Sequence, residues 1–246
     1  MLVLLPPSET KSPGGTGPPL RLDALSFPEL TPTRGRLVET LVRLSEDLPA
    51  SLEALGLSSR QSEEVERNGE LWNSPTLAAL DRYSGVLYDA LDVGSLSGEE
   101  RRRADERLAV VSALFGVLRG ADPVPAYRLS AGSRLPEIGS LRRLWRPELS
   151  RVLESVPGPV VDLRSGAYAA LAALPDPVEV RVVTEDANGS RKTVGHHNKA
   201  HKGRLARALA LAEREPETPA EVAEIAHRAG LRVEQPGRRS LTVVVS

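Results

Sequence analysis

The chain has 246 residues, of which 40% are hydrophobic and 26% charged, and its formal net charge is −1. These values are typical of an ordinary globular protein with a well-formed core, and they argue against a protein that coats nucleic acid through bulk positive charge. Cysteine is absent, which excludes a disulfide framework, a thiolate metal site and a cysteine nucleophile, and with them a thiol peroxidase.

The first predicted element is a strand over residues 1–5, in the segment MLVLLPP. This segment lacks a basic leader and is too short for a signal peptide. No apolar run approaches the roughly 18 residues that a membrane span needs. We therefore expect a cytoplasmic protein with no membrane partner.

A loop rich in proline and glycine follows the first strand, PPSETK and then SPGGTGPP. One interpretation is a surface crossover, because this composition does not support regular structure. The other is a binding loop, since ligands of open α/β sheets lie at the carboxyl ends of strands. In that case Ser8, Thr10 and Lys11 supply its polar contacts.

Residues 33–48 are predicted to be helical from leucines spaced by three and four positions. The segment 51–68 predicts a short helix, a turn at Gly56 and a second helix capped by Ser58 or Ser59. This is the layout of a helix-hairpin-helix, in which backbone N–H groups hold a DNA phosphate without reading sequence. Any tight helix–helix connection has the same spacing, and Glu63, Glu64 and Glu66 would repel a duplex that faced them.

The chain is organised around residues 107–135. The apolar run from Leu108 to Leu118 predicts a strand buried on both faces, and a buried helix is the alternative that periodicity leaves open. Arg119, Arg128 and Arg134 then follow in a loop rich in proline and glycine. Guanidinium groups on a loop fixed by a buried strand are a common anion site, because each offers a planar fork to phosphate or carboxylate.

Further helices are predicted at 97–107 and 141–156, and a strand, turn and helix over 159–174. Arg164 near the end of that strand is either a site residue or a structural partner of Asp162. Strands at 178–184 and 191–195 are expected to form a hairpin through the Asn188-Gly189 turn.

A helix is expected to begin at Asn198, which places Lys199 and Lys202 in its first turn, where the helix dipole favours an anion. The alternative is a basic, exposed helix start. His196, His197 and His201 lie close by, but no neighbouring carboxylate completes a metal site, so no metal is expected.

The final segment predicts a helix opened by Thr218, Pro219 and Glu221, followed by strands at 231–234 and 241–245. The sequence therefore predicts a single α/β domain over residues 1–246. Its mixed β-sheet is surrounded by helices, with a helix-hairpin-helix-like element at about residues 50–70.

Five motifs, in the same order, resemble those of the YaaA peroxide-stress family. GVLR and AYRLSAGSRL are similar to that family's GVLRPxD…YRLEMG signature. The other four segments are MLVLLPPSETK, YSGVLYDAL, DLRSGAY and NKAHKGRLAR. Departures occur at Gly120, where many members have proline, at Ser130, where they have glutamate, and at Glu9, where some have lysine.

The resemblance implies DNA binding and protection against hydrogen peroxide, associated with low unincorporated iron. Together with the residue patterns it predicts one positive cleft that binds double-stranded DNA or a nucleotide-like anion, with no cofactor. The residues expected to line this cleft are Lys11, Gly56, Arg119, Arg128, Arg134, Arg164, Lys199 and Lys202.

The alternative is an enzyme that acts on a nucleotide or modified nucleobase in the same cleft. Its weak catalytic candidates are Ser8, Thr10 and Tyr127, with Tyr127 as an acid. The sequence shows no nucleophile elbow and no phosphate-cradling glycine-rich loop. It leaves the choice between the two functions, and the oligomeric state, open.

Overall fold

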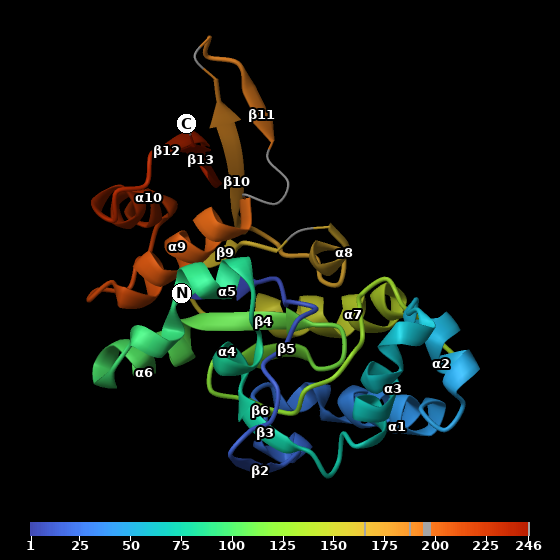
Figure 1. Ribbon diagram of the computed structural model, residues 1–246. Helices are drawn as coiled ribbons and strands as arrows, with labels where there is room; N and C mark the ends of the chain where they lie inside the picture. The colour runs from blue at the N-terminus through green and yellow to red at the C-terminus, as the bar shows by residue number, and fades with distance from the viewer. Residues whose placement is uncertain (165, 187, 194–197, 246) are drawn as a thin grey trace.

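The computed structural model describes residues 1–164, 166–186, 188–193 and 198–245 (Figure 1). An eight-stranded mixed sheet forms its centre, in the order β12-β13-β10-β9-β1-β4-β5, with β11 paired to β10. The strands are β1 (Leu2–Leu5), β4 (Leu108–Ser112), β5 (Gly116–Arg119), β9 (Val160–Asp162), β10 (Val178–Glu185), β11 (Arg191–Thr193), β12 (Val233–Gly237) and β13 (Ser240–Val245).

Five adjacent strands, from β13 through β10, β9 and β1 to β4, run parallel, and β5, β11 and β12 pair antiparallel with their neighbours. All four residues of β1 are buried, as expected for a strand covered on both faces. The mixed α/β architecture predicted from the sequence is confirmed.

Ten α-helices lie around this sheet within the described residues: α1 (Thr31–Leu44), α2 (Leu48–Leu55), α3 (Ser62–Gly69), α4 (Ala79–Arg82), α5 (Val86–Leu91), α6 (Gly98–Arg107), α7 (Leu141–Glu154), α8 (Gly166–Ala169), α9 (Asn198–Leu211) and α10 (Pro219–Arg228). Helices α1, α2 and α3 gather at one end of the molecule, and the β10–β11 hairpin projects from the body (Figure 1). No described helix is long and apolar enough to span a bilayer.

Short strands complete the structure away from the main sheet. They are β2 (Gly17–Pro19), β3 (Pro75–Ala78) and β6 (Pro123–Val124) in one small sheet, and β7 (Arg134–Leu135) with β8 (Gly139–Ser140) in another. The described residues also form four 3-10 turns: η1 (Leu22–Ala24), η2 (Pro28–Leu30), η3 (Ser59–Gln61) and η4 (Val93–Ser95).

The predicted start of the last helix is confirmed in detail. Thr218 accepts from the Glu221 amide, the Glu221 carboxylate accepts from the Thr218 amide, and Pro219 occupies the first turn. For the helix predicted over 33–48, the predicted carboxyl-terminal end is wrong. It stops at Leu44, and a new helix starts at Leu48, because the Asp47 side chain accepts from the Ala50 amide and caps α2.

The single strand predicted over 108–118 is also wrong, because the run forms a hairpin of β4 and β5. Gly116 has φ +75°, and a β-carbon there would lie 2.9 Å from the Trp145 ring, so glycine permits both the turn and the close packing. The register pairs Arg119 with Ala109, near the start of β4. Arg119 therefore lies near the amino-terminal ends of the parallel strands, on the side of the sheet opposite to their carboxyl ends.

Candidate functional site

The central strands β1 and β9 are parallel neighbours whose chain connections lead in opposite directions. In the sheet order β10-β9-β1-β4, the chain leaves β1 toward its neighbour β4 and leaves β9 toward its neighbour β10. The two connections therefore lead to opposite edges of the sheet. Such a reversal opens a crevice at the carboxyl ends of the two strands, where open α/β sheets bind ligands. Residues 6–11, 163–164 and 166–168, which follow the two strands, lie at this edge of the sheet.

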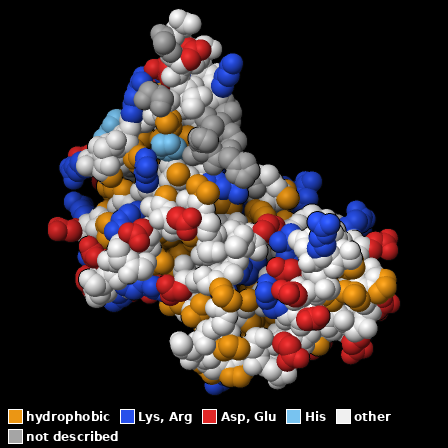
Figure 2. All heavy atoms as spheres, viewed as in Figure 1, with side chains coloured by type: hydrophobic (Ala, Val, Ile, Leu, Met, Phe, Trp, Pro, Cys, Tyr) orange, Lys and Arg blue, Asp and Glu red, His pale blue; other side chains and the backbone are white. Residues whose placement is uncertain are grey.

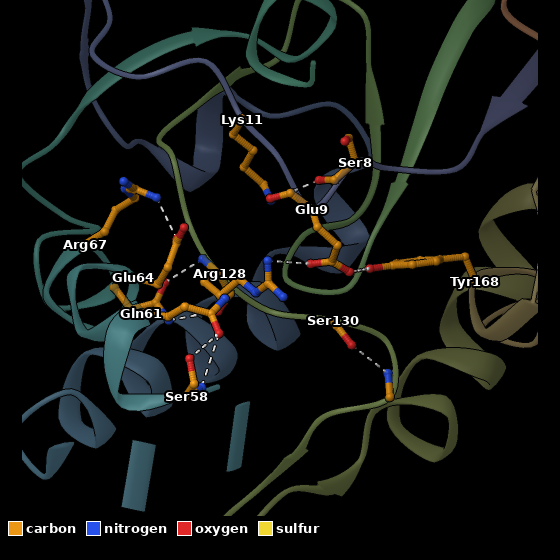
Figure 3. A network of polar contacts seen from close by, with 12 residues as sticks. Ser8, Glu9, Lys11, Ser58, Gln61, Glu64, Arg67, Arg128, Ser130 and Tyr168 are labelled. Atoms are coloured by element: carbon orange, nitrogen blue, oxygen red, sulfur yellow. Dashed lines mark hydrogen bonds and ion pairs between the residues drawn. The ribbon is translucent and has the colours of Figure 1, made fainter. Parts of the chain in front are cut away.

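The Glu9 carboxylate joins three parts of the chain across the crevice (Figure 3). The Tyr168 hydroxyl donates to Glu9 Oε1 at 3.3 Å, and Arg128 Nη1 lies 3.4 Å from Glu9 Oε2. Burial, followed by the Glu9 charge, raises the pKa of the Tyr168 phenol, which stays a neutral donor. Glu9 thus ties the loop after β1 to α8 and to the arginine-bearing loop.

Helix α3 fixes the backbone at Arg128 through one buried side chain. Asn68 Nδ2 donates to the Arg128 carbonyl at 2.8 Å, and the Arg128 amide donates to Asn68 Oδ1 at 2.8 Å. Asn68 is 1% exposed, so the paired bonds are shielded from water. The Nε of Arg128 is buried and has no hydrogen-bond partner among the described residues.

The Lys11 amine lies over two buried aromatic rings. Its Nζ is 4.2 Å from the ring centroid of Tyr127 and 5.5 Å from that of Tyr83. It donates to the carbonyls of Ser8 at 3.2 Å and Glu9 at 3.4 Å. Burial lowers the pKa of Lys11 to about 8, although the Glu9 charge opposes this. Lys11 is partly exposed, so a ligand in the crevice can reach a lysine that is partly neutral near physiological pH.

Behind Lys11, three hydroxyl groups form a hydrogen-bonded chain with a defined direction. Ser112 Oγ accepts from the amides of Leu114 at 3.1 Å and Phe115 at 3.0 Å. Because both of its lone pairs are then engaged, its own proton goes to Tyr127, 2.6 Å away. The Tyr127 proton is consequently donated to Tyr83 at 2.7 Å. This leaves the Tyr83 proton as the terminal one of the chain.

A groove of about 850 Å³ opens beside Glu9 and Arg128. It brings together three of the predicted binding residues, Gly56, Arg128 and Arg134. The other residues of the lining are Glu9, Ala50, Glu53, Ala54, Leu55, Ser130, Gly132, Ser133, Leu135, Pro136 and Gly139. Its charge is mixed, and Figure 2 shows basic and acidic side chains interspersed over the visible face of the molecule.

The helix–turn–helix layout predicted around Gly56 is present, as α2, the turn η3 and α3. Gly56 has φ +65° and ψ 40°, and its amide donates back to Glu53, while the Leu57 amide donates to Leu52 at 2.8 Å. These two amides therefore cap α2, in a Schellman arrangement, and are already engaged within the helix. A phosphate grip by the hairpin, as predicted, would have to use other groups of this element.

The structure gives Arg164 and Lys202 internal partners. Arg164 donates to both carboxylate oxygens of Asp162, at 2.8 and 2.9 Å, and only 2% of its side chain is exposed. Lys202 Nζ donates to the carbonyls of Leu163 at 2.8 Å and Arg164 at 3.3 Å. Both side chains hold the loop after β9. This arrangement agrees with the structural alternative for Arg164, and it gives the Lys202 amine two partners within the protein. Lys199 in the same helix turn is exposed.

Arg119 does not join the groove, so the expected single cleft is corrected. Its guanidinium lies 5.5 Å from the Phe27 ring centroid and donates to the Glu106 carbonyl, in a separate hollow beside α6. The cause is the β4–β5 hairpin, which reverses the chain before Arg119.

The weak catalytic candidates are placed unequally. Ser8 borders the crevice and is partly exposed, and Thr10 is exposed. Tyr127 is 2% exposed between two hydroxyl partners, and burial raises its pKa well above the usual value. Tyr127 is thus the middle member of the hydrogen-bonded hydroxyl chain, and Tyr83 is the last member.

The sequence interpretation missed Ser112, Tyr83, Tyr168 and the Asn68 clamp. Two signals were present, because Tyr83 and Tyr168 lie in YSGVLYDAL and DLRSGAY, motifs of the resemblance. His196 and His197 lie outside the described residues. Among the residues that the structure does describe, no three His, Cys, Asp or Glu side chains are grouped so that they could hold a metal ion.

Comparison with known proteins gives consistent similarities. The sequence profile of a family described as "Peroxide stress protein YaaA" matches residues 1–236. A UPF0246 protein of Corynebacterium glutamicum is 47% identical over 251 residues, covering 100% of both chains. A UPF0246 protein of Streptomyces coelicolor is 43% identical over 239 residues, covering 95% of this chain and 92% of its own.

Proposed function

Because the chain belongs to the YaaA family of peroxide stress proteins, we propose that it is a cytoplasmic protein that protects DNA by binding it through the groove beside Arg128. Double-stranded DNA is the ligand, held mainly through its phosphates. Limitation of intracellular free iron, which the family resemblance implies, belongs to the same protective role, since iron and peroxide together damage DNA.

The observation that carries this proposal is the placement of Arg128. Its backbone is clamped by Asn68, its Nε is a buried donor without a described partner, and its Nη1 faces the solvent-accessible Glu9. Arg134 lines the same groove. Two guanidinium groups lining one groove suit the repeated phosphates of a nucleic acid strand.

The negative charges of the groove set the strength of binding that we expect. Glu9 and Glu53 lie among the lining residues, and the whole chain carries a net charge of −1. Electrostatic attraction to a duplex is therefore local, and log affinity should fall by about 0.9 per phosphate contact for each tenfold rise in salt concentration.

Titration of a fluorescent duplex followed by anisotropy tests the proposal. Replacing Arg128 by alanine should weaken binding about tenfold, because a charge-assisted contact to a phosphate is lost. Arg239→Ala is the matched control, since Arg239 is exposed and lies in a hollow at the amino ends of β9 and β10. Equal affinity of the Arg128 variant and the wild type would contradict the proposal.

The second candidate function is an enzyme acting on a nucleotide or modified nucleobase. The observation in its favour is the partly exposed Lys11 amine, which lies 5.5 Å from the ring centroid of Tyr83. Saturable turnover of a free nucleotide, lost in Lys11→Met, would select this function, whereas duplex binding without turnover would select the first.

A further inference from the structure

The arginines of this chain fall into two groups, those that have a partner within the protein and those that do not. Of 32 lysines and arginines, 28 are arginines, and most of them donate to a carboxylate or a carbonyl. Nine have no side-chain hydrogen bond or ion pair with any residue that the structure describes, and five of these nine lie in the segment 134–151. The nine are Arg60, Arg134, Arg142, Arg143, Arg146, Arg151, Arg204, Arg214 and Arg238.

Three of these arginines, Arg142, Arg143 and Arg146, lie on one exposed face of α7, and we call them the α7 arginine cluster. At 3.6 residues per turn they span an arc of about 100°, and Arg142 and Arg146 are about 6 Å apart along the helix axis. No aspartate or glutamate occurs between positions 138 and 147. Repulsion within the cluster, and the positive end of the helix dipole beside it, both oppose this arrangement. Helix stability therefore does not explain the cluster.

The opposite face of α7 is buried and holds the cluster in place. Leu141, Trp145 and Leu149 are each 0% exposed, and Trp145 Nε1 donates to the Ala113 carbonyl at 2.8 Å. The helix therefore cannot shift without breaking buried contacts, so the backbone of the cluster is ordered before any ligand arrives. A ligand has only to order the arginine side chains.

The cluster begins at the edge of the groove beside Arg128. Gly139 lines that groove, and the next residue, Ser140, is the N-cap of α7. Arg134 on β7 pairs with Ser140 on β8, so this groove arginine also lies beside the start of α7. The far end of α7 lies away from the groove, because Glu154 lines the hollow at the amino ends of β9 and β10.

The chemistry of the cluster suits the phosphates of a duplex. Guanidinium groups offer planar forks that match phosphate oxygens. Single-stranded nucleic acid is bound through exposed aromatic rings, but the one aromatic ring of α7, Trp145, is buried. A membrane-surface helix needs exposed apolar side chains, and among the described residues the large exposed ones are Leu48 and Val86, outside α7.

We propose that the α7 arginine cluster is a second contact surface for double-stranded DNA, next to the groove. This inference rests on the proposed function, because the groove holds one part of the duplex and the cluster holds phosphates of the part that extends beyond it. Phosphate contacts carry no base preference, so the cluster lengthens the bound segment and strengthens binding without adding sequence specificity.

Anisotropy titrations of a fluorescent duplex at several salt concentrations test this inference. The cluster variant is Arg142→Gln/Arg143→Gln/Arg146→Gln, in which glutamine removes the charges and keeps a similar helix propensity. We expect its slope of log affinity against log salt concentration to be shallower by about 2.7, because each of three phosphate contacts contributes about 0.9. Its affinity at low salt should fall at least about tenfold.

A matched control removes three charges from exposed arginines outside the cluster, so that the two variants have the same net charge. It is Arg151→Gln/Arg214→Gln/Arg238→Gln. The control should keep the wild-type slope, and equal slopes in the two triple variants would overturn the second surface. A cluster variant that binds duplex normally but loses binding to phosphatidylglycerol vesicles would also overturn it, and would assign the cluster to a lipid surface.

The groove variant Arg128→Ala/Arg134→Ala separates this inference from the proposed function. A shallower slope in the groove variant, with none in the cluster variant, would leave groove binding intact and overturn the second surface. A shallower slope in the cluster variant alone would support the surface and refute binding in the groove. A wild type that binds no duplex would refute both.

A thiol footprint tests the surface without removing charge. The chain has no cysteine, so Pro147→Cys introduces a single thiol on the exposed side of α7, one turn from Arg143. Duplex should slow its alkylation by iodoacetamide several-fold, whereas Arg214→Cys should react at the same rate with and without duplex. Equal protection at both positions, or protection at neither, would overturn the inference.

Discussion

The amine of Lys11 and the ring of Tyr127 are separated by 4.2 Å, although the two residues lie more than a hundred positions apart in the sequence. Tyr127 precedes Arg128, and Lys11 follows the loop that carries Glu9. The contact therefore joins the loop after β1 to the arginine-bearing loop at one point. It places an amine, a carboxylate and a guanidinium around the same crevice.

The first prediction concerns the pH dependence of Lys11 reactivity. Burial lowers its pKa to about 8, so the neutral fraction should rise about tenfold per pH unit below 8 and level above it. Competitive acetylation read by peptide mass spectrometry measures this, with the exposed Lys192 and Lys199 as internal reference amines. A Lys11 curve that coincides with theirs would refute the lowered pKa.

The second prediction tests how the site accommodates its departures from the family pattern. Glu9 supplies a carboxylate to Arg128, although Ser130 stands where the resemblance expects glutamate. Glu9→Lys should lower stability by about 1 kcal/mol, because three cations then adjoin. It should also raise the neutral fraction of Lys11, because the loss of the carboxylate and the added cation both lower the pKa of Lys11. Adding Ser130→Glu should restore most of the loss, since Ser130 lines the same groove. Urea denaturation of the four-member cycle measures the coupling, and strict additivity would exclude the compensation.

The third prediction concerns the Asn68 clamp. Asn68→Ala leaves the Arg128 amide and carbonyl unpaired in a buried position, which should cost about 2 to 4 kcal/mol of unfolding free energy. Duplex affinity should fall as well, because the Arg128 loop is released. Asn73→Ala, at an exposed position in the same region, is the control and should change stability by less than about 0.5 kcal/mol. Intact stability of Asn68→Ala would show that the clamp is dispensable.

The fourth prediction separates backbone strain at Gly56 from DNA binding. No atom lies within 4 Å of a β-carbon built there, so Gly56→Ala should cost only the left-handed backbone conformation, about 1 kcal/mol. Gly56→Asn should cost less, because asparagine tolerates this conformation. Since the Gly56 amide already caps α2, neither variant should weaken duplex binding under conditions in which it is folded. Weaker binding by a fully folded Gly56→Asn would assign the hairpin itself to the phosphate contact.

The sequence predicted the elements whose signals are local. Thr218, Pro219 and Glu221 begin a helix because side-chain capping depends on a few adjacent residues. The apolar run over 108–118 was misassigned because burial on both faces erases the alternation that distinguishes one strand from a hairpin. That single error also misplaced Arg119, whose position depends on the turn before Gly116.

The candidate site was predicted only in part, because local signals identify single residues but not the contacts between distant segments. Lys11 and Arg128 were identified from charge and turn composition, and the groove contains Arg128, Arg134 and Gly56. Whether a cation is free or already engaged depends on contacts between distant segments. Lys202 is an example, because its partners lie on the loop after β9, about 40 positions earlier. The hydroxyl chain was not predictable, since its members come from three segments that are far apart in the sequence.

The salt dependence of duplex binding tests the central claim, that Arg128 and Arg134 contact DNA phosphates in the groove. The slope of log affinity against log salt concentration is measured by anisotropy for the wild type, Arg128→Ala/Arg134→Ala and Arg239→Ala. The account predicts that the double variant has a slope shallower by about 1.8, because each duplex phosphate contact contributes about 0.9, and that Arg239→Ala matches the wild type. A double variant with the wild-type slope, or a wild type that does not bind a duplex at low salt, would contradict it.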